Sequence, residues 1–470
     1  MQLRASMVAM IVLGFACSTT PRAPSGSIAS PSVPPSPAAP PRETELAAVP
    51  SAGQASSAQG PASRTGPVQL DPDGDDDDDV PSGDGKIPSK AHFERVGVAP
   101  MALLRICDLT PLGDALYAAH ANQPLGTDGA TISRYRPGEA KRPLGIAFDW
   151  NRPGEPTRGG GAGQGFLRVH RIGGRLFVPD ADPPYNGFGI SEPGTEGFVF
   201  VSSPDGTFAP ARMPGHRPPR PPDAQGRPGA AVLPRAYHVI DAIRFRGRYY
   251  ASTGSVPPRQ RAWYGPSPGA LHVASADLSR WEYEIDYPFP WLDGVWRLTF
   301  LVRFRDRLYA GIQDYDGREI NDYVYFSPPA GAVRIERDDV HPVRATARGG
   351  AQTLRWYADR GTLYWIAWGR DGAQLRRTQD GDAWATIALP PDAGAPTDIV
   401  RFRDTLVVLA ERALLALGAD TVSVVARITD RKSPFELTDS FCAAPLGVFQ
   451  NELYAGGQRL GALYRLVADE

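Results

Sequence analysis

A β-hairpin phrase recurs seven times along this chain of 470 residues. In each copy a short apolar run meets a tight turn containing Gly, Asp or Asn, and a second run begins with Leu or Tyr. The second runs start 43 to 73 residues apart. The copies are LTPLGDALYAA (109–119), VHRIGGRLFVP (169–179), AIRFRGRYYAS (242–252), LVRFRDRLYAG (301–311), WYADRGTLYWI (356–366), IVRFRDTLVVL (399–409) and GVFQNELYAGG (447–457).

A repeat of about fifty residues with several strands per unit predicts an all-β protein, a β-propeller of seven blades over residues 91–470, with six blades as the alternative. The third unit predicts four strands, at 238–245, 248–253, 270–276 and 281–286. Helical periodicity is nearly absent, and the apolar run at 406–417 is best divided into two strands at Glu411 and Arg412.

The last unit lacks one strand, and the segment 92–98 is expected to supply it from the other end of the chain. Such closure would remove an exposed sheet edge.

Three turns resemble the Asp-box of sialidase-like propellers, Ser/Thr-x-Asp followed by Gly and Trp. They are SADLSRW (275–281), TQDGDAW (378–384) and SPDGTF (203–208), each shorter than the full box. In that family the box forms the turn between the third and fourth strands of a blade. The hairpin phrase is also similar to kelch-like propellers. The resemblance implies the fold more than an activity.

Arginines flank the recurring turn in RFRGRYYA (244–251), RFRDRLYA (303–310) and RFRDTLVV (401–408). They face away from the long loops, so we interpret Arg246, Arg305 and Arg403 as solvated rim residues and not as a binding patch. The net charge of −2 gives no field that would recruit nucleic acid.

The N-terminus has the layout of an export signal over residues 1–17: a basic start, an apolar core too short to span a bilayer, and Cys17. GFAC (14–17) resembles a bacterial lipoprotein signal, which implies that Cys17 is lipidated and anchors the chain to a membrane. The alternative is an ordinary secretory signal. The expected location is therefore the outer membrane, cell surface or periplasm, or secretion from the cell.

Residues 18–90 are rich in Pro, Ser and Ala and are expected to form a disordered linker. This linker ends in a run of seven aspartates between Asp71 and Asp79. Its spacing does not complete a calcium loop, so we interpret it as a solvated acidic run with at most weak divalent-cation binding, and we expect no cofactor.

Cys107 and Cys442 precede the second runs of the first and last hairpins by similar distances. In a closed ring those two blades are neighbours, and an exported protein occupies an oxidising compartment. We therefore predict a disulfide between the two, placed in the innermost strands of their blades; two buried free cysteines are the alternative. No metal site is expected from two thiols and scattered histidines.

Long loops between second and third strands, and between blades, share the face opposite the tight hairpins, and function concentrates on such loops. Ligand-binding candidates at or near this face are Asp180, Asp182, Tyr185, His238, Trp263, Tyr264, Arg297, Asp314, Asp316, Trp368 and Arg370. We expect His238 and Asp241 to point to opposite sides of their strand and to have separate structural roles.

These observations favour an exported, monomeric binding module for a glycan, a peptide or a protein. One alternative is a sialidase-like glycan-cleaving hydrolase, which would need two carboxylates drawn from Asp180, Asp182, Asp241, Asp314 and Asp316. None of these belongs to a motif that assigns its role, so catalysis is the less favoured interpretation. A structural envelope protein without ligand is the other alternative.

Overall fold

The computed structural model of the chain describes residues 85–99, 105–121, 129–138, 143–150, 165–181, 197–209, 221–223, 225–234, 236, 238–254, 269–287, 296–314 and 321–469. The chain divides into two compact units, Met1–Val68 and Gln69–Glu470, and every described residue lies in the second. The predicted leader with Cys17, most of the linker and the acidic run lie outside the described residues.

The strands follow one another as antiparallel meanders. The first half holds β1 (Ala91–Val98), β2 (Arg105–Leu112), β3 (Ala115–Ala121), β4 (Thr131–Tyr135), β5 (Gly145–Asp149), β6 (His170–Ile172), β7 (Arg175–Pro179), β8 (Gly197–Val201), β9 (Gly229–Leu233), β10 (His238–Phe245), β11 (Arg248–Gly254), β12 (Ala270–Ala274) and β13 (Trp281–Asp286). The second half holds β14 (Trp296–Phe304), β15 (Arg307–Asp314), β16 (Tyr323–Phe326), β17 (Val340–Val343), β18 (Gln352–Asp359), β19 (Thr362–Gly369), β20 (Gly372–Thr378), β21 (Ala385–Ile387), β22 (Pro396–Phe402), β23 (Thr405–Ala410), β24 (Ala413–Leu417), β25 (Val422–Arg427), β26 (Leu446–Phe449), β27 (Glu452–Gly456) and β28 (Ala462–Ala468).

Strand pairing gives three four-stranded sheets and two eight-stranded ones. The four-stranded sheets are β2–β5, β6–β9 and β18–β21. In each larger sheet, one residue pair joins two sets of four strands. Gly254 pairs with Arg297 between β11 and β14, and Ala91 pairs with Ala426 between β1 and β25. Four-stranded antiparallel sets are therefore the repeating unit.

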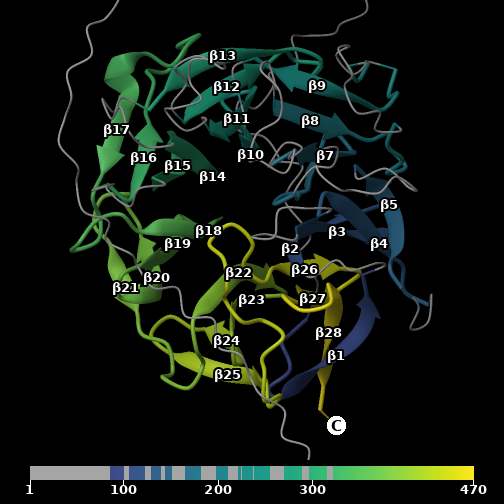
Figure 1. Cartoon of the computed structure of the whole chain (residues 1–470). Helices are drawn as coiled ribbons and strands as arrows, with labels where there is room; N and C mark the ends of the chain where they lie inside the picture. Colours follow the sequence, from purple (N-terminus) through teal and green to yellow (C-terminus); the bar gives the residue numbers. More distant parts are fainter. Residues whose placement is uncertain are drawn as a thin grey trace, which may run out of the picture. The chain divides into compact units, whose positions relative to one another are not determined.

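Successive sets contact one another around a ring, in most cases through their first strands (Figure 1). β2 contacts β6 and β26; β10 contacts β7, β8 and β14; β18 contacts β14 and β22; and β22 contacts β26. Repeated four-stranded meanders whose first strands surround a common centre define a β-propeller. The predicted all-β propeller class is confirmed by this arrangement.

The ring closes with a strand from the N-terminal side of the unit. β1 pairs antiparallel with β28 over Ala91–Val98, so the last set consists of β26, β27, β28 and β1. Phe93 of β1 packs edge-on against Phe435, with ring centroids 5.2 Å apart. The predicted supply of the missing strand by residues 92–98 is confirmed, as is the division of 406–417 into two strands, β23 and β24.

Each hairpin between a first and second strand turns through a residue with positive φ. The first turn residue has φ of 48° at Arg246, 56° at Arg305, 46° at Arg360 and 57° at Arg403. Glycine adopts such angles freely, whereas other residues are strained by about 1–2 kcal/mol. Three of the four arginines make a contact that offsets this strain, whereas Arg360 is exposed.

That contact runs to the neighbouring set of strands. Arg246 Nη1 donates to the carbonyls of Pro328 (2.6 Å) and Pro329 (2.7 Å), and its Nη2 donates to Asp306 O at 3.0 Å. Arg305 donates to the carbonyl of Gln379.

Arg403 donates to Lys86 O at 2.5 Å. These three arginines also lie 4.8–5.6 Å over the preceding phenylalanine ring. Arg305 is exposed and Arg246 and Arg403 are half-buried, as expected of rim residues, but their hydrogen bonds to backbone carbonyls give them a structural role that the sequence did not indicate.

Aromatic side chains fill the space between neighbouring sets. Trp356 of β18 and Trp365 of β19 stack at 5.4 Å between ring centroids, and Tyr309 of β15 lies 6.0 Å from Trp356. These three rings belong to one buried cluster that joins the β14–β17 set to the β18–β21 set. Trp356 and Trp365 are paired directly across β18 and β19, and their packing against Tyr309 stabilises the contact between the two sets.

Candidate functional site

A bulge interrupts the pairing of the first strand in five sets. It lies between Ile106 and Asp108 in β2, between Val239 and Asp241 in β10, and at matching places in β14, β18 and β22. A bulge redirects the side chains beside it and often occurs next to a site. In each of these five sets the bulge lies next to a residue whose side chain contacts other sets of the ring.

We call the residue at this position the axial residue of its set. It lies four positions before the final residue of the set's first strand. The axial residues are Asp108, Arg168, Asp241, Phe300, Arg355, Asp398 and Pro445. Asp108, from β2, lies 3.3 Å from Arg168 and 3.8 Å from Arg355. Arg168 and Arg355 lie over the ring of Phe300, 5.1 and 5.9 Å from its centroid. Contacts between sets so distant in sequence place these groups at the shared centre.

The three axial aspartates make one repeated bond to the next set. The N–H of Val169 donates to Asp108 Oδ2 at 3.0 Å, and the N–H of Leu301 donates to Asp241 Oδ2 at 2.8 Å.

At the third such place, the N–H of Leu446 donates to Asp398 Oδ2 at 2.6 Å. In every case the donor lies one residue after the next set's axial residue. These carboxylates therefore hold neighbouring first strands in register.

The second oxygen of each aspartate meets a cation. Asp241 Oδ1 lies 2.7 Å from His170 Nε2 and 3.5 Å from Arg168 Nε. Asp398 Oδ1 lies 3.2 Å from Arg355 Nε. The Asp241, Arg355 and Asp398 side chains are 1%, 5% and 10% exposed. Because these opposite charges are nearly buried and paired with one another, we assign the axial aspartates and arginines a structural role.

Burial and pairing move the pKa values of these carboxyls in different directions. At Asp241 burial acts to raise the pKa, but Arg168 and His170 outweigh it and hold the pKa below its usual value. Burial raises the pKa of Asp108, and it raises the pKa of Asp398 to about 7 although two backbone N–H groups act against it. The charge of the paired axial residues is thus sensitive to pH at Asp398.

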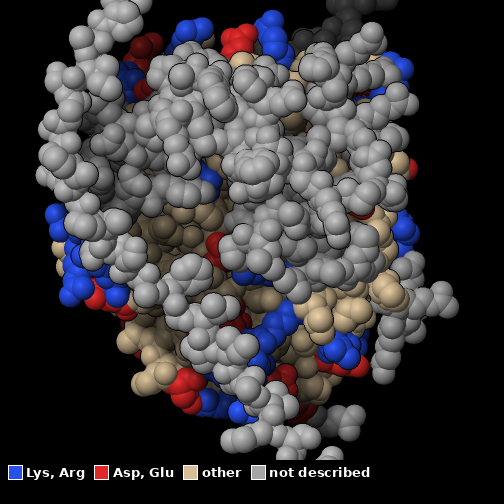
Figure 2. Space-filling model, viewed as in Figure 1, with Lys and Arg blue, Asp and Glu red and all other residues tan. Residues whose placement is uncertain are grey.

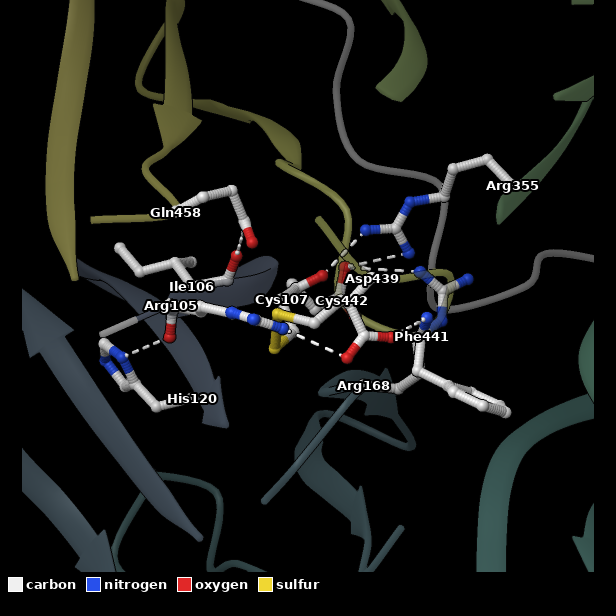
Figure 3. Close-up of a disulfide and its surroundings, with 11 residues drawn as sticks. Arg105, Ile106, Cys107, His120, Arg168, Arg355, Asp439, Phe441, Cys442 and Gln458 are labelled. Carbon is white, nitrogen blue, oxygen red and sulfur yellow. Dashed lines mark hydrogen bonds and ion pairs between the residues drawn. A yellow bond between two sulfur atoms is a disulfide. The ribbon is translucent and has the colours of Figure 1, made fainter. Parts of the chain in front are cut away.

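The predicted disulfide between Cys107 and Cys442 is confirmed, with a Cα–Cα distance of 4.6 Å (Figure 3). Cys107 is the bulged residue of β2. Cys442 precedes β26 by four residues, so its predicted place within the innermost strand is wrong. Both residues are 1% exposed.

Arginines gather around the disulfide, as Figure 3 shows. Arg355 donates to the carbonyl of Cys107 at 2.7 Å. Arg105 donates to Asp439 at 3.0 Å, which ties β2 to the segment that carries Cys442. The carbonyl of Arg105 lies 3.0 Å from Nδ1 of His120, whose pKa burial lowers to about 4.

Three of the predicted ligand-binding residues lie in the interior. Both carboxylate oxygens of Asp180 accept backbone N–H groups, from Phe198 at 2.9 Å and Val239 at 3.2 Å. His238 Nδ1 lies 2.9 Å from the carbonyl of Ala181, and its Nε2 lies 2.8 Å from Arg297 Nη2. These contacts orient loops and strands.

His238 and Asp241 have different partners, in line with their predicted separate roles. The bulge between them pairs His238 with Gly254 and Asp241 with Ser252, two residues apart on β11, so the expectation that they point to opposite sides of the strand is wrong.

Of the other predicted residues, the structure describes three. Trp368 is half-buried, Arg370 is exposed, and Asp314 ends β15. Asp182, Tyr185, Trp263, Tyr264 and Asp316 lie outside the described residues.

Three Ser/Thr-x-Asp turns lie between third and fourth strands, where the sequence placed them. Ser275 Oγ donates to Asp277 Oδ1 at 2.6 Å, and Thr378 Oγ1 donates to Asp380 Oδ1 at 2.9 Å. The N–H of Thr207 donates to Asp205 at 3.1 Å in the third turn. Each aspartate caps backbone or hydroxyl groups of its own turn, which is a local structural role.

Charged groups of both signs are interspersed on the described part of the face seen in Figure 2. Within the described ranges, no group of three or more His, Cys, Asp or Glu residues is placed to hold a metal ion. Nor does any helix among the residues that the structure describes have the length and apolarity to cross a membrane.

No protein-family model matches the chain, and no curated protein matches it. Among solved structures, it is similar to a catalytically inactive virginiamycin B lyase from Staphylococcus aureus bound to quinupristin, with 8% identity, a TM-score of 0.47, and coverage of 81% of this chain and 100% of the other. It is also similar to the computationally designed Ika8 protein (9% identity, TM-score 0.42, 80% and 100% covered) and to the N-terminal domain of Nup159 (10%, 0.40, 82% and 97%). At these identities the likeness concerns the fold, which the strand pairing establishes independently.

Proposed function

We propose that the chain is an exported seven-bladed β-propeller that binds a glycan, peptide or protein on its long-loop face. The blade count is supported by the pairing: each eight-stranded sheet consists of two sets joined by one residue pair, and the last set takes β1 as its fourth strand. Seven sets of four strands agree with the seven hairpin phrases.

Export is supported above all by the disulfide between Cys107 and Cys442, because such bonds persist mainly in oxidising compartments. The lipoprotein-like segment that ends at Cys17 supports a membrane anchor at the same destination. In this proposal the linker holds the propeller away from the membrane, at the cell surface or in the periplasm.

Binding at the long-loop face is supported by how the ring uses its interior charges. The axial aspartates and arginines pair with one another and with backbone groups, which leaves the centre occupied by side chains of the protein itself. Asp180 and Asp241, two of the carboxylates that the hydrolase alternative needs, are engaged in bonds between sets. We therefore place ligand contacts on the long loops.

The test combines localisation with binding. Cells producing the full chain are fractionated beside cells producing Cys17→Ala, which should move from the membrane to the soluble fraction; unchanged partitioning would refute lipidation.

The purified chain is then screened on glycan and peptide arrays, with hydrolysis measured on each hit. Replacing Trp263 and Tyr264 by alanine should abolish binding, whereas Arg360→Ala, on the opposite face, should not. Equal loss with both variants would contradict the proposed face.

A further inference from the structure

We propose that the acidic run between Asp71 and Asp79 binds, within the same chain, to the arginine-rich face formed by four hairpin turns. We call this face the arginine hairpins. It consists of residues 244–248, 303–307, 358–362 and 401–405.

The arginine hairpins carry nine arginines against three aspartates. Arg246, Arg305 and Arg403 donate to neutral carbonyls of neighbouring sets, so their hydrogen bonds leave their positive charge uncompensated. Arg360 is exposed at the turn of β18 and β19. Such a cluster produces a positive potential that attracts an anionic segment.

Three arginines of the cluster lie close to an acidic side chain. Arg401 pairs with Asp359 within the cluster. Arg307 pairs with Asp382 at 2.9 Å, and Arg248 lies 3.6 Å from Glu284. Even with Arg244 and Arg303 left out of the count, seven arginines stand against five acids, the three aspartates of the cluster with Asp382 and Glu284, so an excess of two positive charges remains.

The chain enters the propeller at this face. Lys86 offers its carbonyl to Arg403 at the turn of β22 and β23, and Ile87 packs against the adjacent core cluster. Asp79 lies seven residues before Lys86, a reach of up to about 25 Å in an extended chain.

Neighbouring sheets pack about 10 Å apart, so the next hairpins along the ring lie within reach of a nine-residue run about 30 Å long.

Proximity in the same chain makes weak attraction sufficient. A short flexible connection gives an effective concentration on the order of 1 mM. If the isolated run binds with a Kd of about 100 µM, the face is occupied in roughly nine molecules of ten. An anionic partner approaching the hairpin face would then have to displace the run.

The test uses a labelled synthetic peptide of residues 70–80 and full chains, with fluorescence anisotropy as readout. In one chain the five aspartates at 75–79 are replaced by asparagine. In the control, three acids outside the run, Glu43, Glu45 and Asp84, are converted to their amides. The peptide should bind the 75–79 variant, and bind the wild type and the control about tenfold more weakly, since their own run competes.

Two further variants test the face. Arg305→Gln with Arg360→Gln, in the 75–79 background, should weaken peptide binding. Asp306→Asn with Asp404→Asn should strengthen it, because the change removes two negative charges and keeps the backbone carbonyls that the arginines bind. Binding should fall steeply between 25 and 300 mM salt.

Equal affinity for wild type and the 75–79 variant, or binding to neither, would overturn the proposal. So would binding that the face variants leave unchanged. If vesicles of phosphatidylcholine with 30% phosphatidylglycerol bind the wild type and the 75–79 variant alike while the peptide binds neither, the face is directed to membranes and the proposal is wrong.

Discussion

Replacing Arg246 tests whether arginine occupies this strained position because of its hydrogen bonds to the neighbouring set. Removing the side chain deletes three hydrogen bonds to carbonyls, two at 2.6 and 2.7 Å and one at 3.0 Å. At about 1 kcal/mol for each partly exposed bond, Arg246→Ala should destabilise the protein by about 3 kcal/mol. Loss of the contact with Phe245 adds about 0.5 kcal/mol.

Arg246→Gly deletes the same bonds but relieves the strain of a φ of 48°, which is worth about 1 kcal/mol. It should therefore cost about 2.5 kcal/mol, less than the alanine variant. Arg360 is the matched control, because it has a φ of 46° at the equivalent turn position and is exposed. Arg360→Gly should stabilise the protein by about 1 kcal/mol, and Arg360→Ala should be close to neutral.

The assay is urea unfolding of the oxidised full chain, with hydrogen exchange at the turn of β14 and β15 as a local probe. Faster exchange at Asp306 and its neighbours is expected for both Arg246 variants. The reasoning is refuted if Arg246→Ala is no more destabilising than Arg360→Ala, or if glycine is worse than alanine at both positions.

Three other perturbations have defined outcomes. Replacing Cys107 and Cys442 by serine should cost about 5 kcal/mol, as expected for a crosslink over 335 residues, and an unchanged urea midpoint would contradict this. Because folding raises the pKa of Asp398 from 3.8 to about 7, its contribution to stability is present below pH 4 and lost as the pH rises to 7. Wild type should thus lose about 4 kcal/mol relative to Asp398→Asn over that range in urea titrations; parallel pH profiles would contradict it. Removing residues 1–98 deletes β1 and exposes the edges of β25 and β28, so aggregation by light scattering should rise, and a monomeric product of unchanged melting temperature would contradict the closure.

The fold could be predicted from sequence because its signals are local. A turn such as Arg246 and Gly247 between alternating apolar runs defines a hairpin without reference to the rest of the chain. Cys107 and Cys442 could be paired because ring closure makes the first and last sets neighbours, a topological argument that needs no side-chain detail. Cys442 was misplaced because its distance from the second run was taken as strand, although Pro445 separates it from β26.

The axial cluster could not be predicted, because its pairing crosses sets far apart in sequence. Asp108, Asp241 and Asp398 share an offset of four residues from the end of the first strand, and this offset is a readable signal once the hairpins are aligned. Their partners Arg168 and Arg355 occupy the same offset in other sets, with opposite charge. The hydrogen bonds of Arg246 to the neighbouring set also could not be predicted, because their acceptors are backbone carbonyls, which carry no sequence signature.

The central claim, a propeller closed by a disulfide in an oxidising compartment, is tested most directly on protein isolated from its own cells. Free thiols are blocked with an alkylating reagent at lysis, and the digest is analysed by mass spectrometry without reduction. The account predicts one crosslinked peptide pair joining Cys107 to Cys442, with little alkylation at either residue. Full alkylation of both cysteines would contradict it.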